Sequence, residues 1–129
     1  ILRVKLTRLG GDNARRQAIG TAYDRALAGS GLGLPWRRPG ATHVFHQYVV
    51  SHERRDAIRD AMKTAGVATN IHYPIPVHLQ PAYRGRVPLG PGGMARTEAA
   101  AKAIFSLPMY PQLSDEAVTR TVAALRAAL

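Results

Sequence analysis

The stretch THVFHQYVVSHERRDAIRDAMKTAGVATNIHY, residues 42–73, decides the fold prediction. Residues 42–50 are dense in β-branched and aromatic side chains over a length that suits a strand. Residues 53–65 then carry apolar side chains at helical spacing, and residues 67–73 have the composition of a second strand. This strand–helix–strand order precedes a return rich in proline and glycine. It predicts a small α/β domain, with a small mixed sheet and helices packed on one of its faces.

Outside this stretch, the sequence predicts three further helices and one short edge strand. The helices are expected over residues 12–28, over residues 94–104 and from Asp115 onward, and the strand over residues 105–111. Ser51 and Ser114 are expected to cap the helices that follow them, because their hydroxyl groups can accept bonds from free backbone N–H groups. The glycines at 10–11 should separate the first helix from an opening helical segment, with Asp12 or Asn13 as its cap.

The composition indicates one domain and no membrane span. The chain has 129 residues, of which 46% are hydrophobic, and this is enough to bury one core. It has no cysteine, which excludes disulfides and thiolate chemistry and favours a cytoplasmic location. No apolar run is long enough to span a bilayer. Because the sequence starts at Ile1 within a structured element, we expect it to begin inside a larger protein.

The positive charge of the chain would suit a polyanionic partner. The net charge is +10 and the isoelectric point is about 11.1. The basic residues are nevertheless scattered, mainly as arginine pairs at 15–16, 37–38 and 54–55, with little aromatic interleaving. A solvated surface is therefore favoured, and a basic nucleic-acid-binding α/β module is kept as the alternative.

Polar and aromatic side chains gather where the second predicted strand ends. Three prolines hold residues 74–81 extended, so His72, Tyr73, His78 and Tyr83 could be presented to a ligand or to a neighbouring domain. The alternative is that these residues cover the end of the sheet, with the histidines bonded to nearby carbonyl groups.

Metal binding and the common catalytic motifs find no support in the sequence. His43 and His46 are three residues apart on a predicted strand, so they should point to opposite faces, and no carboxylate follows His72 or His78 closely. The chain has no Gly-x-Ser-x-Gly, no phosphate-binding glycine loop and no His-Glu-x-x-His. We therefore assign no catalytic residue and no metal ligand.

Four segments together resemble one protein family across nearly the whole chain. They are residues 13–16, 43–50, 72–83 and 106–113, and the third reads His-Tyr-Pro-x-Pro-x-His-x-Gln-Pro-Ala-Tyr. They resemble the DegT/DnrJ/EryC1/StrS sugar aminotransferases. The resemblance implies the C-terminal small domain of a fold-type-I enzyme dependent on pyridoxal phosphate (PLP), which closes the active site in a homodimer. Such enzymes transfer an amino group from glutamate or glutamine to a nucleotide-linked keto-sugar.

The resemblance also implies a division of the chain and a set of site residues. Residues 1–30 would form a helical entry segment from a missing large domain, and residues 31–129 the small α/β domain. By their places in the family motif, His72, Tyr73 and His78 would bind the substrate of the parent enzyme.

The lysine that binds the cofactor in this family has no counterpart in the sequence. The lysines of the chain are Lys5, Lys63 and Lys102, and none stands in a motif like that of the family. We therefore expect no cofactor on this chain and no activity from it alone. A fragment of a cofactor-dependent sugar dehydratase or of a regulatory relative remains an alternative, because these replace the lysine.

Overall fold

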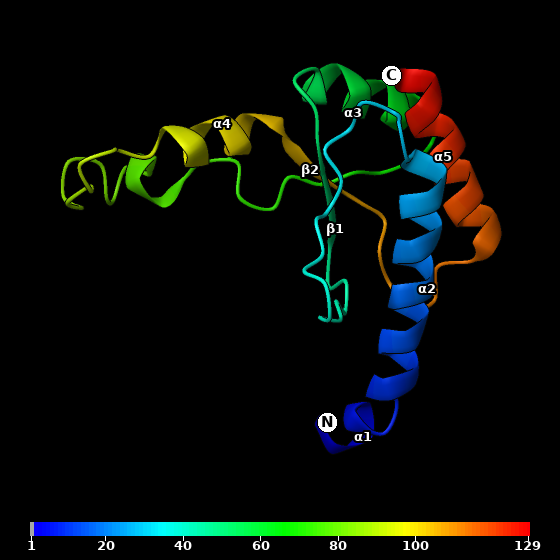
Figure 1. The fold of residues 1–129 in the computed structure, drawn as a ribbon. Helices are drawn as coiled ribbons and strands as arrows, with labels where there is room; N and C mark the ends of the chain where they lie inside the picture. Colours follow the sequence, from blue (N-terminus) through cyan, green and yellow to red (C-terminus); the bar gives the residue numbers. More distant parts are fainter. Residues whose placement is uncertain (1) are drawn as a thin grey trace.

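The computed structural model describes residues 2–129, which form six helical segments and one pair of strands (Figure 1). The elements in chain order are α1 (Leu2–Leu6), α2 (Leu9–Leu27), β1 (Tyr48–Ser51), α3 (Arg55–Thr64), the 3-10 helix η1 (Val77–Leu79), α4 (Ala95–Ala103), β2 (Ile104–Leu107) and α5 (Asp115–Ala128). Helices α2, α3 and α5 lie beside the strands, whereas α1 and α4 lie farther out (Figure 1). Helix α5 packs against both α2 and α3. The predicted α/β domain with helices beside a small sheet is confirmed.

The sheet is smaller than the sequence predicts. Strands β1 and β2 pair antiparallel, with Val49 opposite Ser106. Single antiparallel bridges extend the pair on both sides, from Gly33 to Ser51 and from Asn70 to Ser106. The strand predicted over residues 67–73 is therefore reduced to one bridge, and every pairing in the described chain is antiparallel. The segment predicted at the edge, now β2, is instead paired on both sides.

The strand predicted over residues 42–50 also starts later than expected. Phe45 has a φ of 46°, which places it in the left-handed region and interrupts an extended backbone. The ring of His43 accepts a hydrogen bond from the Phe45 backbone N–H at 2.9 Å and so stabilises this turn. His43 and His46 therefore lie in a turn before β1, and the prediction that they face opposite sides of a strand is wrong.

Fourteen buried apolar side chains form one core between the strands and helices α2, α3 and α5. They are Ile19, Tyr23, Leu27, Phe45, Tyr48, Val50, Ile58, Met62, Val67, Phe105, Leu107, Leu113, Val118 and Leu125. Hydrogen bonds hold the two tyrosines within this core, from Tyr23 to the Pro108 carbonyl at 2.9 Å and from Tyr48 to Asp24 at 2.7 Å. The predicted buried stripes of the helices are thus confirmed where they meet this core.

Two of the predicted helix boundaries are wrong. Helix α2 begins at Leu9 and runs through the glycines at 10–11, so these do not separate it from α1, and neither Asp12 nor Asn13 is its cap. Ser51 lies in β1, and α3 begins at Arg55. The prediction for Ser114 is confirmed, because its hydroxyl accepts a bond from the Ala117 N–H at 3.2 Å.

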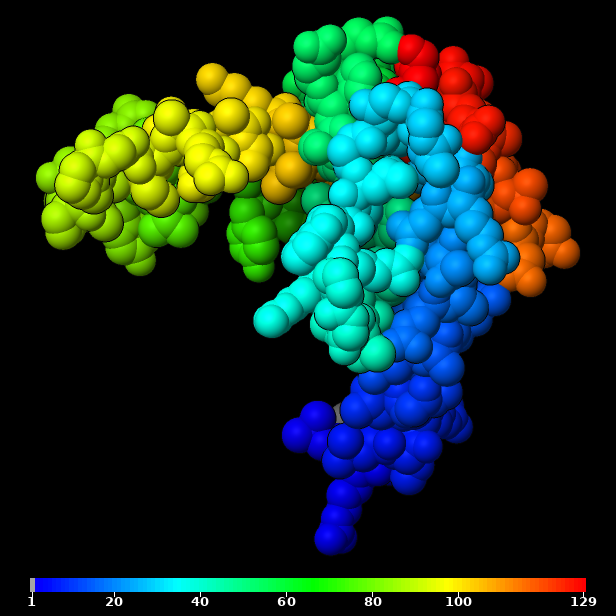
Figure 2. All heavy atoms as spheres, viewed as in Figure 1, coloured from blue at the N-terminus to red at the C-terminus, as the bar shows by residue number. Residues whose placement is uncertain are grey.

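Residues 73–103, here called the arm, project from the rest of the molecule (Figures 1 and 2). The arm includes η1 and α4, and none of its residues belongs to the buried core. It leaves the body just after Asn70 and returns directly into β2, so the bridge between Asn70 and Ser106 closes its root.

No helix within residues 2–129 has both the length and the apolar character needed to cross a bilayer.

Candidate functional site

A hollow of about 420 Å³ lies where β1 begins and β2 ends. It is lined by His46, Gln47, Ala68, Thr69, Asn70, His72, Ser106, Leu107, Pro108 and Met109. The antiparallel register brings these segments together, because the residues before β1 lie opposite those after β2. The predicted site residue His72 thus joins groups from segments more than 20 residues away in the sequence.

The polar side chains that line this hollow carry imidazole, amide and hydroxyl groups. His46, Gln47, Asn70 and His72 offer imidazole and amide groups, and no Lys, Arg, Asp or Glu is among the lining residues. Such groups suit a ligand with several hydroxyl or carbonyl oxygens. His46 and Gln47 were not predicted as site residues. The available signal was that both belong to the segment 43–50, which carries part of the family resemblance.

His72 is anchored to the sheet by its ring. Its Nδ1 lies 3.1 Å from the hydroxyl of Ser106, which is buried on β2. The other face of the residue is open, since His72 is exposed and lines the hollow. The sheet therefore fixes the position of this imidazole.

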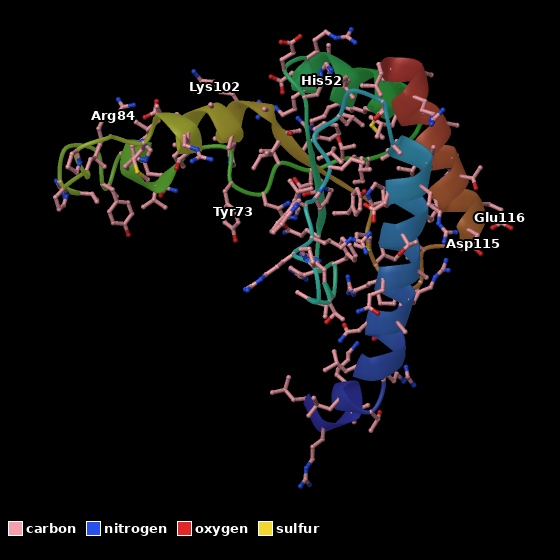
Figure 3. All side chains as sticks on the ribbon, viewed as in Figure 1. His52, Tyr73, Arg84, Lys102, Asp115 and Glu116 are labelled. Carbon is pink, nitrogen blue, oxygen red and sulfur yellow. The ribbon has the colours of Figure 1, made fainter. Side chains whose placement is uncertain are left out.

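Tyr73 projects from the chain where the arm begins (Figure 3). It is 81% exposed, and the figure shows its ring pointing away from the ribbon. A phenol in this position can reach a ligand or a neighbouring domain, but it is not held by the body of the molecule. The substrate-binding role of Tyr73 stays a prediction.

His78 lies within the arm, apart from the hollow that contains His72. Its Nε2 is 3.0 Å from Oε1 of Glu98, and this contact ties η1 to α4. Only 8% of its side chain is exposed. A second hollow, of about 720 Å³, lies nearby between the proline-rich segment and α4. The contact with Glu98 gives His78 a structural role within the arm, and its predicted substrate contact stays a prediction.

The residues of this chain do not fit a PLP site. Lys5, Lys63 and Lys102 lie on α1, α3 and α4, and all three are exposed. Lys102 lines the hollow of the arm beside Pro74 and Leu79, and none of the three lines the hollow with His72. Within residues 2–129, no lysine therefore lies beside the polar groups of that hollow, where it could hold the cofactor.

Several arginine side chains form hydrogen bonds or ion pairs with other elements of the chain. Arg15 donates to the Leu113 carbonyl at 2.5 Å and to Asp115 at 2.7 Å, which ties α2 to the start of α5. Arg126 donates to the Ala26 carbonyl, and Arg59 donates to Thr69. These arginines connect elements of the domain, which weakens the case for a surface that binds nucleic acid.

Comparison with known proteins identifies relatives along almost the entire chain. The chain is 40% identical over 127 residues to the dTDP-3-amino-3,4,6-trideoxy-alpha-D-glucose transaminase of Streptomyces venezuelae. It is 41% identical over 128 residues to the erythromycin biosynthesis sensory transduction protein EryC1 of Saccharopolyspora erythraea. Each comparison covers 98% of this chain but only 33% and 35% of the relative, so the chain spans about a third of their length.

The fold agrees with this relationship. The crystal structure of S. venezuelae DesV in complex with a ketimine intermediate superposes with a TM-score of 0.92 at 40% identity, over 98% of this chain and 34% of that protein. The family model described as the DegT/DnrJ/EryC1/StrS aminotransferase family matches residues 1–126. The chain therefore belongs to the DegT/DnrJ/EryC1/StrS aminotransferase family.

Proposed function

We propose that this chain acts as the small domain of a PLP-dependent aminotransferase that transfers an amino group to a nucleotide-linked keto-sugar. The observation that carries the proposal is that nearly the whole chain matches, in sequence and in fold, a segment that makes up about a third of the length of sugar aminotransferases. The groups that hold the cofactor would lie in the remaining length, because the lysines present here do not fit that role. The homodimer and the amino donor, glutamate or glutamine, follow from the family resemblance.

Within that enzyme, the hollow beside His72 would bind the sugar. Its imidazole and amide groups suit hydroxyl and carbonyl oxygens, and its position at the strand ends leaves it open on one side. Tyr73 would contact the same substrate from the root of the arm, and His78 would contact it from within the arm. The cofactor, when bound to the complete enzyme, supplies an amine carrier and an electron sink. The residues of this chain bind and orient the sugar.

Substitution of His72 and Tyr73 in the complete enzyme tests the assignment of the sugar site. We expect His72→Ala to raise the KM for the nucleotide sugar about tenfold and Tyr73→Phe about threefold, the loss expected for one hydrogen bond each. The KM for the amino donor should stay unchanged in both variants. Steady-state kinetics with each substrate varied in turn measure this.

A matched control lies elsewhere in the chain. His52→Ala removes a histidine at the opposite end of β1. It should leave the two KM values unchanged. If the KM for the sugar in His72→Ala equals that of the parent enzyme, the hollow is not the sugar site.

Borohydride treatment of the complete enzyme distinguishes the aminotransferase from a dehydratase or regulatory relative. In an aminotransferase, reduction should fix the cofactor covalently to one lysine outside this sequence, and peptide mass spectrometry would locate it. A complete enzyme that gives no such adduct would support the alternative, in which the lysine is replaced.

A further inference from the structure

Ser106 is a buried polar residue beside the proposed sugar hollow. It lies in the middle of β2, opposite Val49 of β1 on one side. On the other side, it exchanges two backbone hydrogen bonds with Asn70, of 3.2 and 2.8 Å. Only 7% of the residue is exposed. Its hydroxyl group is therefore a fixed point, 3.1 Å from Nδ1 of His72.

The direction of the bond between Ser106 and His72 follows from the surroundings of the hydroxyl group. Within residues 2–129, the Ser106 hydroxyl has no hydrogen-bond partner other than His72. If Nδ1 carried the proton and donated it, the hydroxyl hydrogen of Ser106 would have no acceptor among residues 2–129. An unpaired buried donor is costly, whereas a free lone pair on oxygen costs less. We therefore assign the hydroxyl group as the donor and Nδ1 as the acceptor of this bond.

This direction determines which form of the neutral imidazole is present. When Nδ1 accepts a hydrogen bond, the proton of the neutral ring resides on Nε2. Nε2 of His72 has no partner in the described part of the chain, and the residue lines the hollow. His72 therefore offers an N–H donor to a ligand in the hollow, and an acceptor oxygen is the complementary group.

We infer that Ser106 is a positioning residue, which holds His72 in the Nε2–H form so that its ring donates a hydrogen bond to an oxygen of the sugar substrate. The inference rests on the proposed function for the identity of the ligand. Its structural part, the control of the ring by Ser106, is independent of any activity. Ser106 also lines the hollow, but this role needs only its contact with the ring of His72 and no contact with the sugar.

The form of the imidazole can be measured directly. We expect long-range nitrogen–proton NMR spectra of the 129-residue chain, with its histidines labelled with nitrogen-15, to show His72 with a protonated Nε2 and a bare Nδ1 at neutral to mildly basic pH. The His72→Ala variant identifies its signals. In Ser106→Ala, the signals should move toward those of a mixture of both neutral forms. A parent chain with the proton on Nδ1 overturns the inference, whatever the kinetics show.

Kinetics of the complete enzyme test the consequence for binding. Ser106→Ala should raise the KM for the nucleotide sugar about three- to tenfold, because His72 is then partly in the form without a proton on Nε2. That form cannot donate a hydrogen bond from Nε2 to the sugar. The KM for the amino donor should not change. Ser106→Thr keeps the hydroxyl group on a strand and should restore most of the lost affinity. Ser51→Ala, a serine on β1 at the other end of the sheet, is the matched control.

The two measurements separate the inference from the proposed function. If Ser106→Ala leaves the KM for the sugar unchanged while His72→Ala raises it, the positioning role is wrong and the sugar site stands. If His72→Ala also leaves it unchanged, the sugar site fails and the positioning role fails with it. In that case, a protonated Nε2 in the parent chain shows that the bond from Ser106 serves the fold alone.

Discussion

At the residue scale, the core places two tyrosines and one carboxylate in contact. The rings of Tyr23 and Tyr48 lie 4.9 Å apart between centroids, and both residues are fully buried. Tyr48 donates to Asp24, which also forms an ion pair with Arg37. Burial raises the pKa of Tyr23 to about 12 and the pKa of Tyr48 to about 12. Both phenols therefore stay neutral in the folded chain at pH values where an exposed phenol ionises.

These raised pKa values predict a loss of stability in alkali. In the unfolded chain, both phenols release their protons near pH 10, whereas the folded chain keeps them to about pH 12. Above pH 10, the unfolded state thus binds fewer protons, and the free energy of unfolding falls as the pH rises to 12, by about 2 kcal/mol per tyrosine. Urea unfolding followed by circular dichroism from pH 8 to 12 measures this.

Variants assign the alkaline loss to the buried rings. Tyr48→Phe should reduce the fall between pH 10 and 12 by about half, since one of the two phenols is gone. It should also lower the stability at pH 8 by about 1 kcal/mol, because the bond to Asp24 is lost. Tyr83→Phe, in the exposed arm, should change neither value. A free energy of unfolding that stays constant up to pH 12 would show that the phenols do not titrate as described.

At the scale of single elements, helix α2 contains glycines in opposite surroundings. A Cβ atom on Gly20 would lie 2.6 Å and 2.7 Å from ring carbons of Phe45, whereas one on Gly10 would meet nothing within 4 Å. The Phe45 ring is buried and packs against Tyr48 at 5.7 Å between centroids, with the Arg37 guanidinium 5.0 Å from the ring centre. The ring therefore has little freedom to move away.

The same substitution should have opposite effects at these two positions. We expect Gly20→Ala to destabilise the chain by about 1–3 kcal/mol through overpacking, despite the higher helix propensity of alanine. Gly10→Ala should stabilise the chain by about 0.5 kcal/mol, because it restricts the unfolded chain and creates no clash. Urea midpoints of the two variants decide this, and equal shifts in one direction would contradict the packing against Phe45.

The helices were more predictable from the sequence than the strands. The periodic apolar stripes of α3 and α5 and the cap at Ser114 are local signals, and the structure retains them. The strand signal over residues 42–50 failed in its first half, because Phe45 turns its side chain into the core through a left-handed backbone. Composition does not report such a turn. Residues 67–73 failed as a strand because only Asn70 finds a partner.

The candidate site was predictable only where a local sequence signal marks its residues. His72 was found because an unusual local motif contains it. His46, Gln47 and Ser106 were missed, since they reach the hollow only through the antiparallel register of β1 and β2, which joins segments far apart in the sequence. Family resemblance pointed to the segments that contain these three residues but not to their common location.

At the scale of the whole molecule, the chain has one well-packed body and one arm, which hydrogen bonds from His52 to Ala103 and from Arg55 to Ala101 join to the body at its C-terminal end. The body buries all fourteen core side chains, and none of residues 73–103 contributes to them. The described contacts that hold the arm together include the pair of His78 and Glu98 and a series of turns around Tyr83. Segments with few buried contacts open locally at low cost in free energy.

Limited proteolysis should therefore cut the arm before the body. In the 129-residue chain, we expect trypsin to cleave after Arg84 or Arg86 before any bond inside α2, α3 or α5, as mass spectrometry of timed samples would show. Arg37, in an exposed loop, should resist longer because it pairs with Asp24 and its guanidinium lies over the Phe45 ring. A first cleavage within the three core helices would contradict this order.

The contact between His78 and Glu98 should set the rate of cleavage in the arm. Glu98→Ala removes the carboxylate but keeps a residue that favours the helix α4, so the loss of the contact is its main effect. A partly exposed pair of this kind contributes about 0.5–1 kcal/mol to local closure, and its loss should speed cleavage in the arm about two- to fivefold. Glu116→Ala, an exposed acidic residue on α5, is the matched control and should leave the rate unchanged. Equal cleavage rates in the parent chain and in Glu98→Ala would mean that the contact does not hold the arm together. The predicted role of His78 in substrate binding would then be the remaining explanation for its place in the motif.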